Sequence, residues 1–480
     1  MIFLYPSIKN TSYLHLSILI LAVHWFFSES VIESFSSNCF VAKKIDDSTN
    51  SANPPAKSKS ETPSNPPSNP SLNPPPNAPE FITVFDPAQD GYVSIRIPAV
   101  VVSNSGTILA FAEGRAANRD QAKNQLILKR SHNHGKTWDK LQVIASAGDQ
   151  SLNNPCAVVE HRSGKIILVY QSYPSGISEQ SKKLQPGYHG NNIVRNYIIS
   201  SNDDGKTWSP PRDITTQSKR QEIVTTVASG PGIGIQLRHG PHAGRLIIPF
   251  NQGPFGLWQI YVIYSDDNGT NWKMGENVPG GVVEILDNLA KGNLKDNPQK
   301  NRTPLQKKPH LQSIVNEVQV VELQNGTIRC NARTSGNEVL RKTALSKDGG
   351  QTWSAIESVA ELRDPHCMAS IFRFSDSVDP QNGDQKIRSN HLQPKKNKSR
   401  ILYSGPQSNR REKGTIFLSY DEAKTWPIHR LLRKDSFAYS CLTALQDGQI
   451  GCLFEADSMQ KIVFARFSLD WLTEGKDKNE

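Results

Sequence analysis

Cysteine is scarce in this sequence, with 6 residues in 480, and no Cys-x-x-Cys pair or histidine at zinc-ligand spacing accompanies it. We therefore predict no metal site, and no other motif asks for a cofactor. Cys39 stands apart near the N-terminus. Most of the other five are expected to be buried thiols in strands: Cys156, Cys330, Cys367, Cys441 and Cys452. Cys441 and Cys452 stand in successive strand-like runs and could be cross-strand neighbours, but sequence alone establishes no bridge.

The N-terminal apolar run, Tyr13–Phe27, is too short to be an ordinary membrane span. It has fifteen residues without Lys, Arg, Asp or Glu, whereas a helix needs roughly 20 to cross a bilayer. Lys9 precedes the run, and Ser28-Glu29-Ser30 has the small-x-small form of a cleavage site. We predict a signal peptide over residues 1–30, with an uncleaved anchor as the alternative. The protein would then be secreted, periplasmic or at the cell surface, and only such an anchor would touch a membrane.

Acidic residues are outnumbered, and the formal net charge is +10. The excess is concentrated in two stretches, Lys291–Lys308 and Lys386–Arg400, which carry six basic residues each against one acidic residue, Asp296. Nucleic-acid binding would need such charge on one face with aromatic residues interleaved. No such aromatics are present, so these stretches are expected to be solvated loop insertions and no nucleic-acid partner is predicted.

Residues 31–80 have little that could be buried. From Asp46 to Glu80 the chain is mostly Pro, Ser, Asn and Lys, with ten of the 31 prolines between Pro54 and Pro79. Such a composition predicts a disordered, extended linker. The folded domain is therefore expected to occupy residues 81–475.

Long amphipathic helical patterns are hard to find in that domain, and short β-type runs separated by turns take their place. A Ser-x-Asp-x-Gly-x-x-Trp box is repeated five times, at SHNHGKTW, SNDDGKTW, SDDNGTNW, SKDGGQTW and SYDEAKTW. The Asp side chain can accept hydrogen bonds from its own turn, Gly permits positive φ, and the Trp needs burial. Asn133 replaces the Asp in the first box and Ala423 the Gly in the fifth, and we interpret both as weakened turns.

The spacing of the boxes indicates the architecture. Their starting serines lie 70, 64, 81 and 73 residues apart, and about 65 residues hold four short strands with their loops, which is one propeller blade. Five boxes with unboxed flanks predict an all-β, six-bladed β-propeller in which one blade lacks a box. An array of β-sandwiches is the structural alternative.

Three arginines beside strand-like runs suggest a binding site. Arg96 heads a buried run, and Arg333 and Arg411 stand beside two others far downstream. An arginine at such a place is costly unless it is paired or functional. If the three converge on the propeller axis, their guanidinium forks could hold one small carboxylate, although each alone could equally be a structural ion pair.

Several separated motifs, in order, resemble the bacterial-type exo-sialidases (neuraminidases). They are RIP at Arg96, the five boxes, GIQLRHGPHAGRLI, NE at Asn316–Glu317, NAR ending at Arg333, and YSCLTALQDG from Tyr439. The resemblance implies a six-bladed propeller with its active site at the axis. It also implies a retaining exo-α-sialidase that removes terminal sialic acids from oligosaccharides, glycoproteins or glycolipids.

The resemblance further implies the residue roles. Arg96, Arg333 and Arg411 match the triad that grips the substrate carboxylate. Asp120 matches the acid/base, Tyr439 the nucleophile, Glu317 the nucleophile's partner, Glu455 the acid that steadies the first arginine, and Arg115 a further arginine near the acid/base loop. The residue types suit the chemistry, because a neutral phenol avoids the repulsion that a carboxylate nucleophile would meet from the substrate carboxylate.

Two alternatives and one departure stay open at this point. A trans-sialidase would need an acceptor-stacking aromatic at the mouth of the site, for which Trp258 and Tyr188 are candidates. A catalytically silent carbohydrate-binding propeller would not need the Tyr–Glu pair. Asn154 stands where many relatives have an acidic residue, which leaves the preferred sialic acid variant open. Five glycosylation sequons begin at Asn10, Asn268, Asn301, Asn325 and Asn397.

Overall fold

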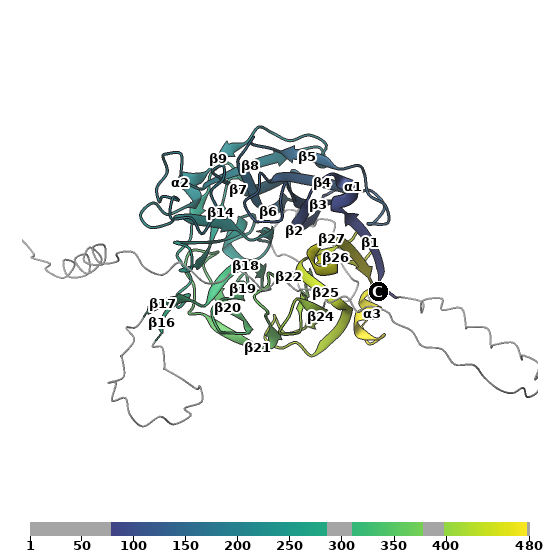
Figure 1. The fold of residues 1–480 in the computed structure, drawn as a ribbon. Coiled ribbons are helices and arrows are strands. Elements are labelled where there is room, and N and C mark those ends of the chain that lie inside the picture. The colour runs from purple at the N-terminus through teal and green to yellow at the C-terminus, as the bar shows by residue number, and fades with distance from the viewer. Residues whose placement is uncertain (1–77, 286–309, 378–397, 478–480) are drawn as a thin grey trace, which may run out of the picture. The chain divides into compact units, whose positions relative to one another are not determined.

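The computed structural model describes residues 78–285, 310–377 and 398–477, and the predicted leader, most of the predicted linker and most of the two basic stretches lie outside them. The described part is a ring of β-sheets around a central axis, seen end-on in Figure 1. Within it no helix has the length and apolar character to cross a bilayer. The predicted all-β propeller is confirmed.

Six blades follow one another around the ring (Figure 1). Four of them have four strands, blade 2 has a short fifth strand, and the innermost strand of blade 3 is divided into two. Blade 1 contains β2 (Ser94–Val102), β3 (Ile108–Arg115), β4 (Gln125–Ser131) and β5 (Gln142–Ala145). Blade 2 contains β6 (Ser151–Glu160), β7 (Lys165–Tyr173), β8 (Arg195–Ser201) and β9 (Arg212–Asp213), with β11 (Gly232–Ile233) parallel to β6. Blade 3 contains β10 (Thr226–Ser229), β12 (Ile235–Gln236), β13 (Leu246–Gly253), β14 (Gln259–Ser265) and β15 (Lys273–Met274). Blade 4 contains β18 (Val315–Glu322), β19 (Ile328–Thr334), β20 (Leu340–Ser346) and β21 (Glu357–Arg363).

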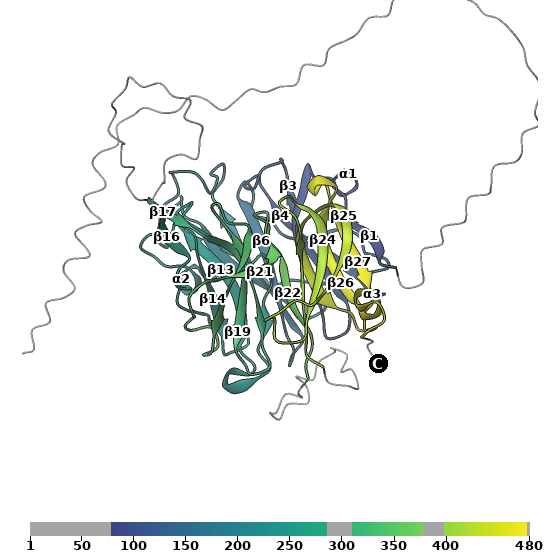
Figure 2. The ribbon, with the colours of Figure 1, turned by 90° about the horizontal axis from the view of Figure 1, so that it is seen from below.

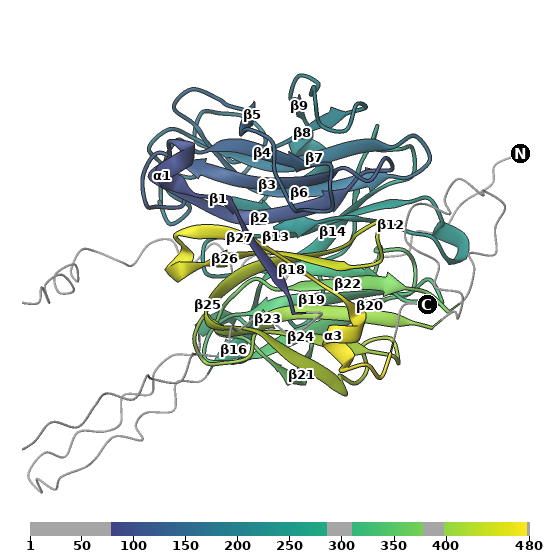
Figure 3. The same ribbon diagram turned by 90° about the vertical axis from the view of Figure 1, so that its right-hand side faces the viewer.

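The last two blades share one long strand, β25 (Ile428–Ala444). Its first half pairs with β24 (Glu412–Ser419) and its second half with β26 (Ile450–Ala456). Blade 5 is completed by β22 (Ser370–Ser375) and β23 (Arg400–Pro406), and blade 6 by β27 (Lys461–Phe467) and the N-terminal strand β1 (Glu80–Phe85). Figure 3 shows β1 beside β27. A strand from the start of the domain therefore closes the last blade and the ring.

Short connections complete the fold. The hairpin β16 (Val282–Ile285)–β17 (His310–Ser313) lies between blades 3 and 4, and α1 (Pro87–Asp90) between β1 and β2. Figure 2 shows both at the same end of the strands. The remaining helical turns are α2 (Thr215–Ser218), η2 (Gly240–His242), η3 (Asp457–Met459) and α3 (Leu469–Thr473). Connections at the α1 end lead into the innermost strands, so side chains there can converge on the axis.

The five boxes occupy the turns between the third and fourth strands of blades 1 to 5. Blade 6 has none in its described part, so one blade lacks a box, as predicted. In each box the serine hydroxyl accepts the N–H of the residue four positions on, at 2.8–2.9 Å. In the second box, a Cβ on Gly205 would lie 2.5 Å from Leu109 of blade 1, and Trp208 packs on Phe111 of that blade with ring centroids 5.8 Å apart. The boxes thus join consecutive blades, and apolar clusters fill the spaces between them.

Cys441 and Cys452 lie on adjacent strands, but they do not face one another. Cys441 is paired across the sheet with Leu453, and Cys452 with Leu442. Because side chains alternate between the two faces of a sheet, the two thiols point to opposite faces. All five cysteines of the described domain are free and buried.

Candidate active site

A cavity of about 290 Å³ lies at the axis, at the end where the innermost strands begin. Seven of the eight predicted residues line it: Arg96, Arg115, Asp120, Glu317, Arg333, Arg411 and Tyr439. They come from blades 1, 4, 5 and 6, so residues more than 300 positions apart meet in one place. The eighth, Glu455, lies behind the wall and is fully buried.

The backbone of the innermost strands is irregular at this end. The register of β2, β6, β18 and β25 shifts where each approaches the cavity. Ile97 and Asn154 adopt positive φ angles of 65° and 54° there, which is rare for a β-branched residue. Bulges re-aim neighbouring side chains, and here they accompany the turn of Arg96 and Tyr439 toward the axis.

Arg96 is held by Glu455 in a bidentate ion pair. Its Nε and Nη2 donate to the two carboxylate oxygens at 2.8 Å each, and the N–H of Ile97 donates to Oε1 at 3.0 Å. Burial raises the pKa of Glu455, but the charge and hydrogen bonds of Arg96 lower it further, so the carboxyl is held below its ordinary pKa. Glu455 therefore contacts Arg96 directly, and its role as the acid that steadies this arginine stays a prediction.

Tyr439, Glu317 and Arg333 form a compact triangle. The phenol donates to Glu317 Oε1 at 2.5 Å, and Arg333 Nη1 donates to Glu317 Oε2 and to the phenolic oxygen, each at 2.9 Å. Burial and then the Glu317 charge raise the pKa of Tyr439 well above its ordinary value, and the three arginines only partly oppose them. The phenol is therefore neutral, with its proton directed at a carboxylate.

Arg411 differs from the other two arginines of the triad. Its guanidinium donates to the carbonyl oxygen of His366 at 2.8 Å and contacts the sulfur of Met459 at 3.4 Å. Among the described residues it has no carboxylate within salt-bridge distance. Its Cζ lies 5.4 Å from the centroid of the Tyr439 ring, as does that of Arg96. Of the three triad arginines, Arg411 therefore has the positive charge that is least neutralised by acidic residues of the protein.

Asp120 lies on the loop between β3 and β4, and its side chain is 60% exposed. Its Oδ1 accepts a hydrogen bond from Arg115 Nη1 at 2.9 Å. Arg115 is itself nearly buried and also pairs with Glu113. Arg115 therefore contacts two acids of the protein and borders the cavity beside the Asp120 loop, where the resemblance placed it.

Two acidic residues near the site were missed from the sequence. Glu179 lines the cavity, and burial, followed by the charges of Asp120 and Glu317, raises its pKa to about 7. Glu179 lies in a loop, and no motif around it indicated a functional residue. Glu113 is fully buried beneath the Asp120 loop. It stands in the apolar run AFAEG, much as Glu455 stands in CLFEAD. An acidic residue inside an apolar run is a signal that could have identified Glu113 as a candidate.

Of the open points noted in the sequence, Asn154 and one of the two candidate aromatics lie at the cavity. Asn154 borders it, and its backbone N–H donates to Glu113 at 2.6 Å. Trp258 also borders it, whereas Tyr188 donates its hydroxyl to the carbonyl of Lys219 and is not part of the lining. No group of three or more metal-ligating side chains is present among the described residues.

Comparison with known proteins agrees with the fold and the repeats. The BNR repeat-like domain family matches residues 106–452. The sialidase of Micromonospora viridifaciens is 31% identical over 80% of this chain and 53% of its own length, and human sialidase-3 is 28% identical over 80% and 91%. This chain thus spans about half the length of the first of these relatives. The solved structure of Hadza microbial sialidase Hz136 matches with a TM-score of 0.65 and 24% identity, over 82% of this chain and 69% of that one. The chain belongs to the sialidase family that carries BNR repeats.

Proposed function

We propose that this protein is a retaining exo-α-sialidase that hydrolyses terminal sialic acid residues of glycoconjugates. The observation that carries the proposal is the Tyr439 hydroxyl, 2.5 Å from Glu317 Oε1 and 2.9 Å from Arg333 Nη1, in a cavity that Arg96 and Arg411 also line. A binding module has no need of a phenol directed at a buried carboxylate. A glycosidase that must attack beside a substrate carboxylate does need one.

Arg96, Arg333 and Arg411 would bind the substrate carboxylate and place the anomeric carbon next to Tyr439. Arg96 and Arg333 already share their charge with Glu455 and Glu317, so Arg411 supplies most of the net attraction. Guanidinium–carboxylate hydrogen bonds are charge-assisted and geometrically specific, which suits selection of an acidic sugar.

Two displacements would follow. The phenolic oxygen of Tyr439 attacks the anomeric carbon while its proton passes to Glu317, and the glycosidic oxygen leaves with a proton from Asp120. Asp120 then removes a proton from water, the water oxygen attacks the anomeric carbon, and Tyr439 recovers its proton from Glu317 as it leaves. Each displacement inverts the centre, so the sugar is released with retained configuration.

The test is release of 4-methylumbelliferone from its α-sialoside, with the first anomer of free sialic acid followed by proton NMR. We expect turnover and initial appearance of the α-anomer. Initial appearance of the β-anomer would contradict the Tyr439 mechanism, and absence of turnover between pH 4 and 8 would favour a silent binding propeller.

Transfer to a second sugar is the runner-up, and one feature favours it. Phe255 is 46% exposed and stacks edge-to-face on Trp258 with ring centroids 5.6 Å apart, and both residues line the cavity. Exposed aromatic faces are suited to hold a sugar acceptor. Incubating the enzyme with a sialoside donor and excess lactose, followed by product analysis, separates transfer from hydrolysis.

We further propose that the protein acts outside the cytoplasm on sialylated oligosaccharides, glycoproteins or glycolipids. The support is the signal-like segment at residues 1–30, which lies outside the described residues. N-terminal sequencing of the protein made by its natural host distinguishes cleavage near Ser30 from an uncleaved anchor.

A further inference from the structure

Glu113, on β3, is a fully buried carboxylate that receives hydrogen bonds from four residues. Arg115 Nε and Asn124 Nδ2 donate to Oε2 at 2.8 and 3.2 Å, and Asn153 Nδ2 and Asn154 N donate to Oε1 at 3.3 and 2.6 Å. Every recorded partner is a donor, so the arrangement fits the ionised form. Burial raises the pKa of Glu113 above its ordinary value, and Arg115 and the backbone N–H of Asn154 oppose that rise only in part.

Three of these four partners also hold Asp120. Asn124 Nδ2 and Asn153 Nδ2 donate to its carbonyl oxygen at 2.6 and 2.8 Å, and Arg115 Nη1 donates to its carboxylate at 2.9 Å. The side chain of Asp120 is largely exposed and sits on a loop without strand pairing. Its position therefore depends on these donors, and the donors are oriented by Glu113.

We propose that Glu113 is a positioning residue for the acid/base Asp120, an inference that rests on the proposed function. An ion buried without purpose is expensive. Here the buried charge of Glu113 orients the side-chain amides of Asn124 and Asn153 and the guanidinium of Arg115. These groups surround a loop that must present the carboxyl group of Asp120 to the leaving oxygen. Replacing Glu113 by glutamine would set an amide N–H₂ against one of the two donor sets, because both carboxylate oxygens face donors only.

A positioning role makes a specific kinetic prediction. A sugar alcohol is a poor leaving group and needs the proton of Asp120, whereas 4-nitrophenolate leaves readily without it. Because kcat/KM reports the steps up to release of the leaving group, displacement of Asp120 should slow a natural sialoside far more than an activated aryl sialoside. A variant that simply lost part of its folded population would slow both equally.

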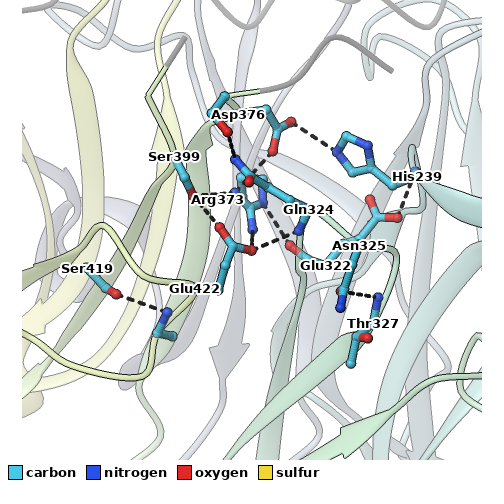
Figure 4. Close-up of polar contacts among 12 residues, drawn as sticks. His239, Glu322, Gln324, Asn325, Thr327, Arg373, Asp376, Ser399, Ser419 and Glu422 are labelled. Carbon is cyan, nitrogen blue, oxygen red and sulfur yellow. Dashed lines mark hydrogen bonds and ion pairs between the residues drawn. The ribbon is translucent and has the colours of Figure 1, made fainter. Parts of the chain in front are cut away.

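The test compares kcat/KM of Glu113→Gln on 3′-sialyllactose and on 4-nitrophenyl α-sialoside. We expect a loss of roughly tenfold or more on sialyllactose, since general acid catalysis is worth about 10²–10⁴-fold, and a loss below about threefold on the aryl sialoside. The matched control is Glu322→Gln. Glu322 is also a buried acid on a blade strand, but it lies at the opposite end of the axis and accepts the N–H of Arg238 and His239 at 2.8 and 2.9 Å (Figure 4). This control should leave the ratio of the two rates unchanged.

Equal losses on both substrates, or no loss on sialyllactose, would overturn the proposal. A second variant, Asn124→Ala, removes a link between Glu113 and the Asp120 carbonyl without changing charge, and should show the same selective loss if Glu113→Gln does not fold. An inactive wild-type protein on both substrates would instead reject the proposed function, so the two failures are distinguishable.

Discussion

The two ends of the propeller axis are built from similar residues and differ in how their charges are used. At the cavity end, arginines and buried acids surround Tyr439. At the opposite end, Arg373 pairs with Glu422 at 2.5 Å and with Asp376 at 3.1 Å (Figure 4), and Arg238 also pairs with Asp376. A second cavity there, of about 120 Å³, is lined mainly by valines and isoleucines at the far ends of the same strands.

The comparison shows that buried arginine–carboxylate pairs do not by themselves indicate an active site. At the opposite end, both Arg238 and Arg373 have acidic partners. What distinguishes the cavity end is Arg411, whose recorded partners are neutral, and a phenol that donates to a carboxylate. Changes at the cavity end should therefore alter catalysis, and changes at the other end should alter stability.

The strongest test of this distinction removes two buried tyrosine hydroxyls in separate variants, one at Tyr439 and one at Tyr403. Tyr439→Phe should lower kcat/KM by at least about 100-fold, roughly 2.7 kcal/mol of barrier, because the nucleophile is lost. Its matched control is Tyr403→Phe. The Tyr403 hydroxyl is buried and has no hydrogen-bond partner among the described residues, so its loss should leave kcat/KM unchanged. Steady-state assays on a fluorogenic sialoside measure both. Equal rates for Tyr439→Phe and wild type would mean that another group is the nucleophile.

A smaller catalytic effect is expected for the third arginine. Arg411→Ala should lower kcat/KM roughly 30-fold, mainly through KM, because one charge-assisted interaction with the substrate carboxylate is worth about 2 kcal/mol. Arg373→Ala, at the other end, should instead lower the denaturant midpoint, because Glu422 loses its arginine partner and Asp376 loses one of its two. The distinction fails if Arg373→Ala raises KM while its midpoint stays at the wild-type value.

Much of the fold was predictable because its signal is repeated. A box that places Ser, Gly and Trp at fixed spacing reports the same turn five times, so the blade count followed from the interval. The convergence of Arg96, Arg333, Arg411, Glu317 and Tyr439 was predictable only through ordered motifs that resemble a family, since no local pattern brings distant strands together. Their catalytic roles stay predictions.

Other features depend on tertiary contacts that no spacing reveals. Glu113 is functional in our proposal only because Asn124, Asn153 and Arg115 meet around it, and these come from two blades. Cys441 and Cys452 were correctly placed on neighbouring strands, but which face each occupies depends on a one-residue difference in register. Arg411 looked like its two partners in the sequence, and only the structure shows that its contacts are neutral.

Acid should weaken the opposite end in a defined pH window. Burial raises the pKa of Asp376, but His239, whose Nε2 lies 3.4 Å from its carboxylate, and the charges of Arg238 and Arg373 outweigh burial and hold the pKa at about 2, against 3.8 when unfolded. The folded carboxylate therefore contributes about 2 kcal/mol of stability above pH 4, and this is lost as the pH falls through 2. Asp376→Asn should be less stable than wild type at pH 6, with the gap closing between pH 4 and 2 in denaturant titrations. A gap that is constant with pH would contradict this assignment.

The smallest effect is expected in the fifth box, also at the opposite end. Ala423 adopts a φ of 61°, where the other four boxes have glycine. A left-handed conformation costs an ordinary residue about 1–2 kcal/mol, and glycine avoids that cost while losing up to about 1 kcal/mol to backbone entropy. Ala423→Gly should therefore raise the free energy of unfolding by about 0.5 kcal/mol and leave kcat/KM unchanged.

Gly205→Ala is the reciprocal control and should destabilise by more, because it combines a φ of 77° with a contact of 2.5 Å to Leu109. If Ala423→Gly instead destabilises the fold, then the methyl group's packing in the cluster with Trp426 outweighs the backbone strain, and the fifth box is adapted to alanine rather than weakened by it.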